Sequence, residues 1–436
     1  MSDRLKPKCS ALQLITCIGA DDQRTCSPLP TRRDSRTAML RGGLLHAASA
    51  VISLGLCASA LTTMSPVHAQ TTLTVTNNTD ASGQALTGSL RQVLEYAAFN
   101  GAYGGAPFTV NFAIGTGQQT IALTSPLPLV NFATVIDGYT QPTATPNTLP
   151  NNIGGSNAAI RIVLDGTSVI SASGGIYLSA ANSAVRGLSI VGFGTSPGIF
   201  AAATNVSIDG NFIGVLPDGT ARPNSIGVTS AASGVVVGGA TPAARNVVAC
   251  NLGAGVNGGA DIRNNEIGTR PDGTTACANG GAGINLAGGV ANIGGAGVGN
   301  FIRNNTGDGI TVAGASNFSI IGNTITGNSG KGINIIATEC ASNGVRIRAN
   351  NIGPNGGLGI DLAPLGRDVN DALDIDVALG CITVANRGQN YPVFDLVTYR
   401  PNATAVTFTV ASEASKTYDV EVFSSANADT SDAGKG

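Results

Sequence analysis

The segment NFIRNNTGDGI, residues 300–310, decides the fold because close copies of it recur through the middle of the chain. Its pattern is Asn-x-(Ile/Val), two residues, a second Asn, three residues, and Gly-(Ile/Val). Further copies begin at Asn246, Asn323 and Asn350, and copies with an insertion between the two Asn residues begin at Asn211 and Asn265. Because the copies start 19–35 residues apart, each should be one structural unit that stacks on its neighbours.

Within a copy, apolar and polar residues alternate, as in Ile310-Thr311-Val312. This period of two predicts short strands rather than helices, and the intervening Gly and Asn residues supply turn conformations. One copy therefore makes three strands and three turns, a single coil of a parallel solenoid with coils about 4.8 Å apart. The recurring side chains would form a buried amide ladder at one corner, made of Asn246, Asn300, Asn323 and Asn350.

The composition agrees with a narrow all-β solenoid. Gly accounts for 60 of 436 residues, aromatic residues for 4%, and Trp is absent, which fits a globular α/β core poorly. The formal net charge is −2, so the chain lacks the basic signature of a nucleic-acid-binding protein. We expect a monomer.

Residues 1–69 have the features of a presequence. Four arginines at 32, 33, 36 and 41 precede the apolar stretch 44–61, and Val67-His68-Ala69 resembles a cleavage site before Gln70. His46 and small residues interrupt the apolar stretch, which favours a signal peptide over a membrane anchor. Met39 is an alternative start. We therefore expect an exported protein, extracellular or on the outer cell surface, with no transmembrane segment in the mature chain.

Cleavage before Gln70 would remove both His residues of the chain. It would also remove eight basic and four acidic residues, which changes the formal net charge from −2 to −6. Without His, neither Ser/His or Cys/His catalysis nor a His-ligated metal site is available. Four Cys residues remain, which permits disulfides in an exported chain.

The spacing of the cysteines suggests which ones pair. Cys250 and Cys277 lie 27 residues apart, about one coil, and both stand just before the second Asn of their copies. Adjacent coils would bring their Cα atoms within the roughly 4.4–6.8 Å that a disulfide needs. Cys340 and Cys381, on either side of the end of the solenoid, are a weaker second pair.

Four regions follow along the chain: the presequence 1–69, a cap with the first coils at 70–157, the repeats at 158–366, and a junction and tail at 367–436. A capping box, Ser89 with Gln92, opens a short amphipathic helix that should cover the first coil. Strands are expected at 108–114, 119–124 and 133–136, followed by a Pro/Thr/Asn-rich loop at 140–157. In the tail, alternation at 393–399, 405–410 and 418–423 predicts a truncated β-sandwich-like segment.

The junction carries an acidic run of five oxygen-bearing side chains, Asp368, Asn370, Asp371, Asp374 and Asp376. Alternating carboxylate and amide oxygens in a loop are what Ca²⁺ prefers, although the run lacks the Gly and distal Glu of an EF-hand. Two readings stay open: a Ca²⁺ site that stiffens the junction, or a solvated acidic linker. No other cofactor is expected.

Six segments carry a family resemblance: GSLRQVLEYA (88–97), TVIDGYTQPTATPNTLPNN (134–152), GNFIGVLPDGT (210–220), NNEIGTRPDGT (264–274), IGGAGVGNFIRNN (293–305) and QNYPVF (389–394). They resemble bacterial exported right-handed parallel β-helix repeat proteins of the pectin-lyase-like class, over roughly residues 71–424. The resemblance implies a right-handed parallel β-helix that is exported and surface-associated. In such relatives the tail usually continues further, so we expect a fragment or a chain without downstream modules.

Two outward columns of a solenoid can be aligned from the repeats. The column after Gly-(Ile/Val) holds Phe200, Thr229, Asn257, Asn285, Thr311, Asn334 and Asp361. The column beside the leading Asn holds Phe212, Val247, Glu266, Phe301, Thr324 and Asn351. Each contains one acid, whereas a glycosidase needs two carboxylates about 5–10 Å apart.

We therefore assign no catalytic residue and expect a non-catalytic, adhesin-like scaffold that contacts glycans or surface components. A polysaccharide lyase or glycoside hydrolase is the alternative. Arg346, Arg348 and Asp361 form the best mixed cluster, which would hold an acidic sugar or make a surface salt bridge. Asp218 and Asp272, in two Pro-Asp-Gly segments, are interpreted as turn residues.

Overall fold

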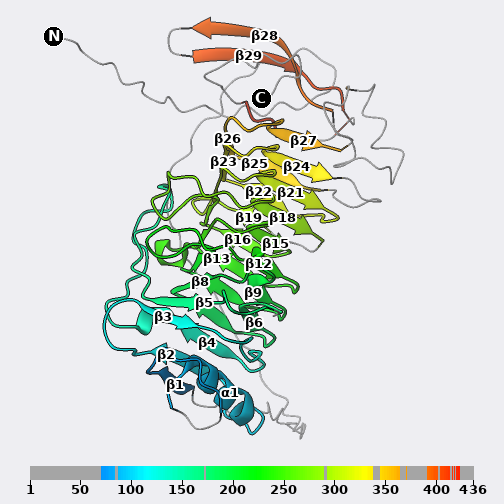
Figure 1. Cartoon of the computed structure of the whole chain (residues 1–436). Helices are drawn as coiled ribbons and strands as arrows, with labels where there is room; N and C mark the ends of the chain where they lie inside the picture. Colours follow the sequence, from blue (N-terminus) through cyan, green and yellow to red (C-terminus); the bar gives the residue numbers. More distant parts are fainter. Residues whose placement is uncertain are drawn as a thin grey trace, which may run out of the picture. The chain divides into compact units, whose positions relative to one another are not determined.

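The computed structural model describes residues 70–83, 87–170, 173–288, 292–336, 344–363, 370, 390–400, 403–412, 415, 417 and 419–422. Over the first five of these ranges the chain winds into stacked coils that build three parallel sheets, here called A, B and C, and from residue 134 onward each coil contributes a strand to all three. Figure 1 shows the coils following one another along a single axis, from helix α1 to strand β27. The predicted all-β solenoid is confirmed.

Sheet A has ten strands in the described part of the chain, and they pair in sequence order. They are β1 (Thr71–Val75), β2 (Phe108–Phe112), β4 (Thr134–Asp137), β7 (Ala184–Arg186), β10 (Ser207–Asp209), β13 (Val236–Gly238), β16 (Asp261–Arg263), β19 (Ile293–Gly294), β22 (Ser319–Ile321) and β25 (Arg346–Arg348). Alternate residues of each strand enter the core, for example Ile208, Ile262 and Ile320.

Sheets B and C show nine and eight strands among the same described residues. Sheet B consists of β3 (Gln119–Ala122), β5 (Ile162–Asp165), β8 (Leu188–Val191), β11 (Phe212–Ile213), β14 (Val247–Val248), β17 (Glu266–Ile267), β20 (Phe301–Arg303), β23 (Thr324–Thr326) and β26 (Asn351–Ile352). Sheet C consists of β6 (Ile176–Leu178), β9 (Pro197–Ala201), β12 (Ile226–Ser230), β15 (Val256–Gly258), β18 (Ile284–Ala287), β21 (Ile310–Ala313), β24 (Ile333–Ile336) and β27 (Ile360–Leu362). Short 3-10 turns η1 (Gly138–Thr140) and η2 (Pro242–Ala244) follow β4 and β13.

Two columns of buried Asn side chains hold the corners of the coils on either side of sheet B. In the first column, the amide oxygen of Asn300 accepts hydrogen bonds from the backbone N–H and from Nδ2 of Asn265, both at 2.9 Å. Nδ2 of Asn300 donates to the carbonyl of Ile262 at 2.8 Å. The same pattern links the members of the first column, which are Asn211, Asn246, Asn265, Asn300, Asn323 and Asn350. The four side chains predicted to form a ladder lie together in this column.

A second Asn column, which the sequence pattern also contains, stands between sheets B and C. It runs through Asn224, Asn251, Asn279, Asn305, Asn328 and Asn355, with side-chain bonds of 2.9–3.1 Å. The Gly of each repeat follows it, where a side chain would collide with the next coil. A Cβ on Gly309 would lie 2.5 Å from Cγ2 of Ile325 and 2.7 Å from the carbonyl oxygen of Gly332. Steric fit therefore explains why the repeat requires Gly at this position.

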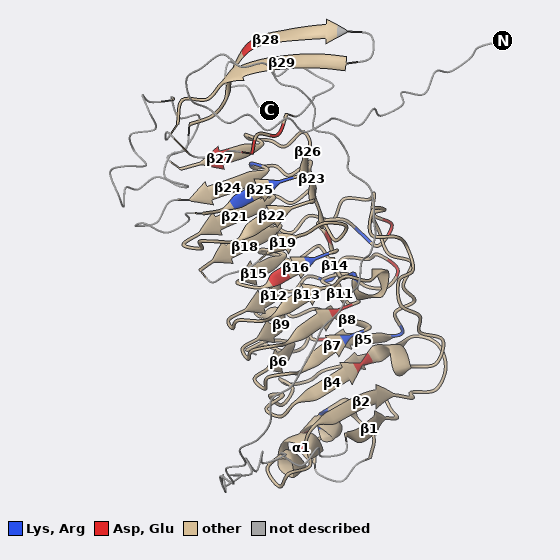
Figure 2. Ribbon diagram, turned by 180° about the vertical axis from the view of Figure 1, so that it is seen from behind, with Lys and Arg blue, Asp and Glu red and all other residues tan. Residues whose placement is uncertain are grey.

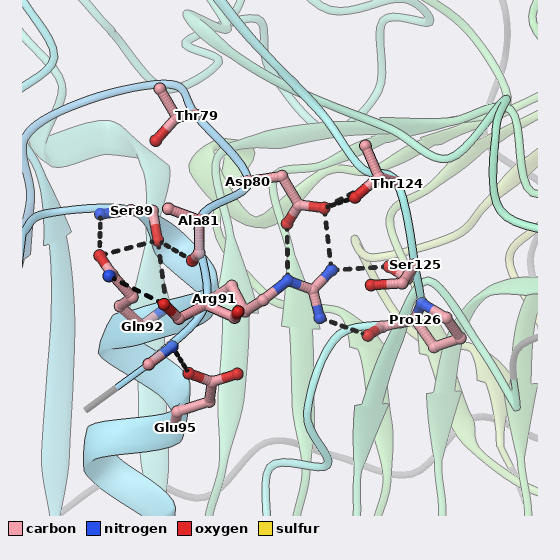
Figure 3. Close-up of polar contacts among 12 residues, drawn as sticks. Thr79, Asp80, Ala81, Ser89, Arg91, Gln92, Glu95, Thr124, Ser125 and Pro126 are labelled. Carbon is pink, nitrogen blue, oxygen red and sulfur yellow. Dashed lines mark hydrogen bonds and ion pairs between the residues drawn. The ribbon is translucent and has the colours of Figure 1, made fainter. Parts of the chain in front are cut away.

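Helix α1 (Leu90–Gly101) caps the first coil, and its start is the predicted capping box. The hydroxyl oxygen of Ser89 accepts a hydrogen bond from the backbone N–H of Gln92, while the Gln92 side chain accepts from the Ser89 N–H. Figure 3 shows the neighbouring contact, in which the buried Arg91 donates to Asp80 and to the carbonyls of Ser125 and Pro126. The helix thus closes the apolar end of the solenoid and ties it to the following loop.

The tail contains one described antiparallel pair, β28 (Val393–Arg400) with β29 (Ala403–Thr409). The strands predicted at 393–399 and 405–410 correspond to this pair. The third strand predicted at 418–423 is wrong for 419–422, which are described and form no strand. Two strands cannot bury a face between them, so alternation alone was too weak a signal there.

Candidate functional site

Sheet C carries an outward column that is partly exposed to solvent over most of its length. Parallel pairing places Phe200, Thr229, Asn257, Asn285, Thr311, Asn334 and Asp361 in one row, as the repeat alignment predicted. The middle members are polar, uncharged and partly exposed. Nδ2 of Asn285 donates to the amide oxygen of Asn257 at 2.8 Å, so neighbouring coils hold each other's side chains in place. This row is a straight ridge of amide and hydroxyl groups.

The N-terminal end of the ridge is aromatic. The rings of Tyr177 and Phe200 stack with centroids 4.8 Å apart and planes 15° apart. The separation matches the coil spacing, so the rings stack along the solenoid axis. One face of each ring is therefore covered by the other ring.

The C-terminal end of the ridge is charged. Asp308 accepts hydrogen bonds from the hydroxyl of Thr311 at 2.9 Å and from Nδ2 of Asn334 at 2.8 Å. Lys331 bonds the Asn334 amide oxygen at 3.2 Å and makes an ion pair of 2.5 Å with the buried Asp361. Ionic groups at this end thus order the last polar side chains of the ridge.

The structure corrects the cluster predicted from Arg346, Arg348 and Asp361. The two arginines belong to β25 on sheet A, whereas Asp361 belongs to β27 on sheet C and pairs with Lys331. Arg348 instead lies 2.9 Å from Asp419 and 3.5 Å from Glu421. Proximity in sequence misled the prediction, because neighbouring strands of one coil face different directions.

Sheet B differs from sheet C because its outward column is buried from β11 to β20, although its last members, Thr324 and Asn351, are partly exposed and exposed, respectively. The row through Phe212, Val247, Glu266 and Phe301 is confirmed by the strand pairing, but all four side chains are at most 8% exposed. The expectation that this column faces solvent is therefore wrong for these coils. A loop covers them, residues 145–159, which we call the strap.

The strap is closed at its base by two backbone hydrogen bonds between Thr145 and Ala159, of 3.2 and 2.8 Å. Such a compact loop with adjacent ends is an Ω-loop. Asn147 ties it to the carbonyl of Pro242 at 3.0 Å, and Asn151 reaches the carbonyls of Ala240 and Gly297 at 2.9 and 3.1 Å. The strap thus spans several coils of sheet B.

An ion cluster lies beneath the strap. The fully buried guanidinium of Arg245 donates to three strap carbonyls, those of Pro150 at 2.9 Å and of Ile153 and Gly155 at 2.6 Å. Glu266, also fully buried, accepts the Gly155 N–H at 2.8 Å. Burial raises the pKa of the Glu266 carboxyl, and the nearby arginines oppose this.

Two aromatic contacts complete this cluster. The guanidinium of Arg303 lies 4.3 Å from the ring centroid of Phe301, and that of Arg245 lies 5.7 Å from it. Arg303 also stands 3.8 Å from the Glu266 carboxylate. Cations over an aromatic face gain electrostatic energy, which partly offsets their loss of hydration.

The disulfide partners predicted from coil spacing lie under the same cover. Cys250 and Cys277 are joined, with Cα atoms 4.9 Å apart, and they pack with Phe212, Val215 and Ile160. Two insertions flank them as small hairpins, bridged at Val215–Ala221 and Thr269–Ala276.

Asp218 and Asp272 sit in the turns of these hairpins. The Asp218 carboxylate accepts the Thr220 N–H at 2.8 Å, which lowers its pKa. Asp272 accepts the Thr274 and Thr275 N–H groups at 2.7 Å, and contacts to these threonines lower its pKa to about 2. Both carboxylates serve the turns, as their Pro-Asp-Gly context indicated.

Sheet A carries a charged cluster that the sequence alignment missed. Asp137, Arg186 and Asp209 occupy one outward row on three successive strands. Arg186 pairs with Asp137 at 2.7 Å, and Asp209 accepts the Ser207 hydroxyl at 2.8 Å. Burial raises the pKa of Asp209. Figure 2 colours the charged residues, which are sparse along the coils and therefore stand out.

The missed signal was present in the sequence. The strand before each leading Asn ends in an outward position, and this position reads Asp137, Arg186, Asp209, Gly238 and Arg263 in successive coils. Aligning that column would have revealed two carboxylates with an arginine between them. The prediction that the outward columns hold no pair of acids therefore applies to the other two sheets alone.

Several predicted site residues lie outside the described residues, namely Asp368, Asp371, Asp374, Asp376, Cys340 and Cys381. Asn370 is described, and its side chain exchanges hydrogen bonds of 2.7 and 2.9 Å with the backbone of Tyr391. Within the described ranges, no group of three or more His, Cys, Asp or Glu side chains is arranged to hold a metal ion. No helix in those ranges is long and apolar enough to cross a membrane.

Comparison with known proteins supports the architecture. Residues 227–391 match the family model described as "Right handed beta helix region", so the solenoid is a right-handed parallel β-helix. No curated protein sequence matches the chain. Two solved structures align with part of this chain. One is the Dettilon tailspike protein, at 18% identity and a TM-score of 0.33, over 68% of this chain and 65% of that one.

The other is the A-module of the Azotobacter vinelandii mannuronan C-5 epimerase AlgE4, at 12% identity and a TM-score of 0.36. That match covers 66% of this chain and 81% of the epimerase module. The chain thus spans less than two thirds of the tailspike. Neither similarity indicates which of the three sheets would bind a ligand.

Proposed function

We propose that the chain is an exported β-helix scaffold that contacts glycans through the ridge on sheet C, without catalysis. The observation that carries this proposal is the row from Thr229 to Asn334, in which every coil offers one amide or hydroxyl group. Sugars are recognised by such neutral donors and acceptors. The regular spacing suits weak contacts repeated along a chain-like ligand, whose avidity grows with the number of contacts.

Export is supported by two features of the chain. The segment before Gln70 has the arrangement of a cleavable signal peptide. The pairing of Cys250 with Cys277 requires an oxidising compartment to persist. Mass spectrometry of the protein secreted by its native host tests both, because it reports the mature N-terminus and whether the thiols are free.

A glycan array tests the binding itself. We expect the mature chain to be retained on a subset of glycans, and the double variant Asn257→Ala/Asn285→Ala to lose at least about tenfold in apparent affinity. The matched control, Thr109→Ala/Ser319→Ala, removes two outward hydroxyls from sheet A and should bind like the wild type. Equal binding by all three proteins, or no binding at all, would contradict the proposed ridge.

The sheet A cluster supports a second candidate, a glycoside hydrolase. The strands that carry Asp137 and Asp209 are two spacings apart, about 9.6 Å, close to but just beyond the roughly 6.5–9.5 Å between the two carboxyl groups of inverting enzymes. Asp209, with its raised pKa, would act as general acid. New reducing ends from a polysaccharide panel, abolished by Asp209→Asn but kept by Asp261→Asn, would replace the non-catalytic proposal with this one.

A further inference from the structure

The strap carries few apolar side chains of its own toward sheet B. Ala158 packs with the cluster around Phe212, but Ile153 is 51% exposed and Leu149 is half-buried. Pro146 and Pro150 are exposed. By contrast, Arg245 alone takes three of its carbonyls and Glu266 takes one of its N–H groups. A segment with few buried apolar contacts belongs to the least stable part of a fold.

The ion cluster beneath the strap adds to this marginal balance. Closing the strap takes Arg245 and Glu266 fully out of water. The hydration lost by two buried ions offsets much of the attraction between them, so the closed state gains little net free energy from the cluster. When the strap is open, both ions regain water. The coils beneath keep their own Asn ladders in either state, because no ladder bond involves the strap.

We propose that the strap is a lid: residues 145–159 leave sheet B as a unit while the coils stay folded. Arg245 and Glu266 are the latch, and the backbone pair Thr145–Ala159 is the base about which the loop moves. Opening uncovers the Glu266 carboxylate and the guanidinium of Arg245, which bond the strap in the closed state. The Phe301 ring and the guanidinium of Arg303 lie beside them.

Hydrogen exchange in the intact chain tests the lid directly. The reporters in the strap are the amides of Gly155 and Ser156, bonded to Glu266 and to the carbonyl of Pro271. The reporters in the coils are the amides of Asn265 and Asn300, bonded to the next Asn side chain. We expect the strap amides to exchange at least about tenfold faster than the ladder amides, with a weaker dependence on urea.

Variants identify the latch. Arg245→Met removes all three carbonyl contacts and also two bonds to the amide oxygen of Asn264, at 2.9 and 3.2 Å. It should speed exchange of the strap amides by about tenfold or more, while the ladder amide of Asn300, away from Asn264, keeps its wild-type rate. The matched control is Arg263→Met, an arginine on sheet A whose ion-pair partner is Asp261. This control should leave the exchange rates of both the strap amides and the ladder amides unchanged.

One result would overturn the lid: strap and ladder amides that exchange at a common rate, with the same urea dependence, in the wild type. The strap would then open only when the whole solenoid unfolds. This comparison needs no variant, so it decides the matter even if Arg245→Met fails to fold. Faster ladder exchange in the control would show that loss of an arginine acts through general destabilisation, and it would equally count against the latch.

Discussion

Sheets B and C are built from the same coils, yet from β11 to β20 the outer face of sheet B is covered, whereas that of sheet C stays partly exposed. In sheet B the outward residues Phe212 and Val247 are at most 1% exposed. In sheet C the corresponding residues Thr229 and Asn257 remain accessible and polar. The difference comes from insertions and from the strap, which all gather over sheet B. A repeat therefore fixes the coils, whereas the segments outside the repeat decide which face can meet a ligand.

The contrast also separates two uses of Asn. In the corners, Asn side chains satisfy backbone groups that no water can reach. On sheet C, the same side chain faces solvent and can bond a ligand. Position within the coil, rather than residue type, sets the role.

The largest loss of stability should come from a substitution in one of the buried Asn columns at the corners of the coils. Asn279→Ala removes an acceptor for the N–H and Nδ2 of Asn251, at 3.2 and 2.9 Å, and a donor to the carbonyl of Val248 at 3.0 Å. The Asn251 N–H and the Asn305 amide oxygen, which accepts from Asn279 at 2.9 Å, are left without a partner, and each such buried group costs about 1–3 kcal/mol. We expect the free energy of unfolding to fall by about 2–6 kcal/mol, measured by urea denaturation. A loss below about 1 kcal/mol would mean that the ladder is dispensable.

The next largest loss of stability should come from removing the disulfide beneath the covered part of sheet B. Replacing Cys250 and Cys277 by Ala opens a cross-link between residues 27 apart in the chain. Loss of such a link typically costs about 2–4 kcal/mol. The midpoint of urea unfolding should fall accordingly. Wild-type protein treated with a reductant is the control, and it should shift to the same midpoint if the two cysteines are paired in the natural protein.

A smaller loss is expected where sheet C begins. Gly309→Ala places a methyl group 2.5 Å from Ile325 and 2.7 Å from the Gly332 carbonyl, so the coils must shift. Such overpacking costs about 1–3 kcal/mol. The matched control is Gly194→Ala, where a Cβ meets nothing within 4 Å. If both variants unfold at the same urea concentration, the steric explanation of the repeat Gly is wrong.

The ladders and the Gly column could be predicted because they depend on spacing within one coil and on the next coil. The strap could not. Arg245 binds the carbonyl of Gly155, 90 residues earlier in the chain, and nothing in the composition of either segment marks that contact. A Pro- and Asn-rich loop without periodicity carries no signal for the surface on which it lies. The insertions in the copies at Asn211 and Asn265 were the one visible sign that sheet B differs.

The sheet A cluster was missed for another reason. Its members Asp137 and Arg186 precede the clear copies of the repeat, so the pattern did not place them in register. The candidate site on sheet C, by contrast, lies directly after the best-defined position of each copy. The sequence pattern thus aligned the outward column of sheet C correctly. It placed the column of sheet B in solvent, although four of its side chains are buried, and it gave no alignment for sheet A.

The latch should respond to pH. Burial raises the pKa of Glu266 above its ordinary 4.5 in the closed state, where Arg245 and Arg303 are the charged groups that face it. The closed strap is therefore stabilised most below pH 4.5, where Glu266 is protonated in both states. This stabilisation is lost as the pH rises from 4.5 through the higher pKa of the closed state, and the free energy of closure changes by at most about 1.4 kcal/mol per pH unit. Exchange of the Gly155 amide, corrected for intrinsic rate, should show this slope. In Glu266→Gln the slope should vanish; its persistence would assign the titration to another group.

The smallest loss of stability is expected from a substitution on the outer face of sheet C, and it tests most directly whether sheets B and C differ. Asn285→Ala removes one hydrogen bond, the 2.8 Å contact from its Nδ2 to Asn257, and water can replace both partners. Surface changes of this kind stay within about 0.5 kcal/mol. Asn285 lies six residues after Asn279, so the two Ala variants remove the same side chain from two positions of one coil, a buried corner and the outer face of sheet C. A loss of stability in Asn285→Ala as large as that in Asn279→Ala would mean that the ridge is structural, and that sheet C is no freer to bind a ligand than sheet B.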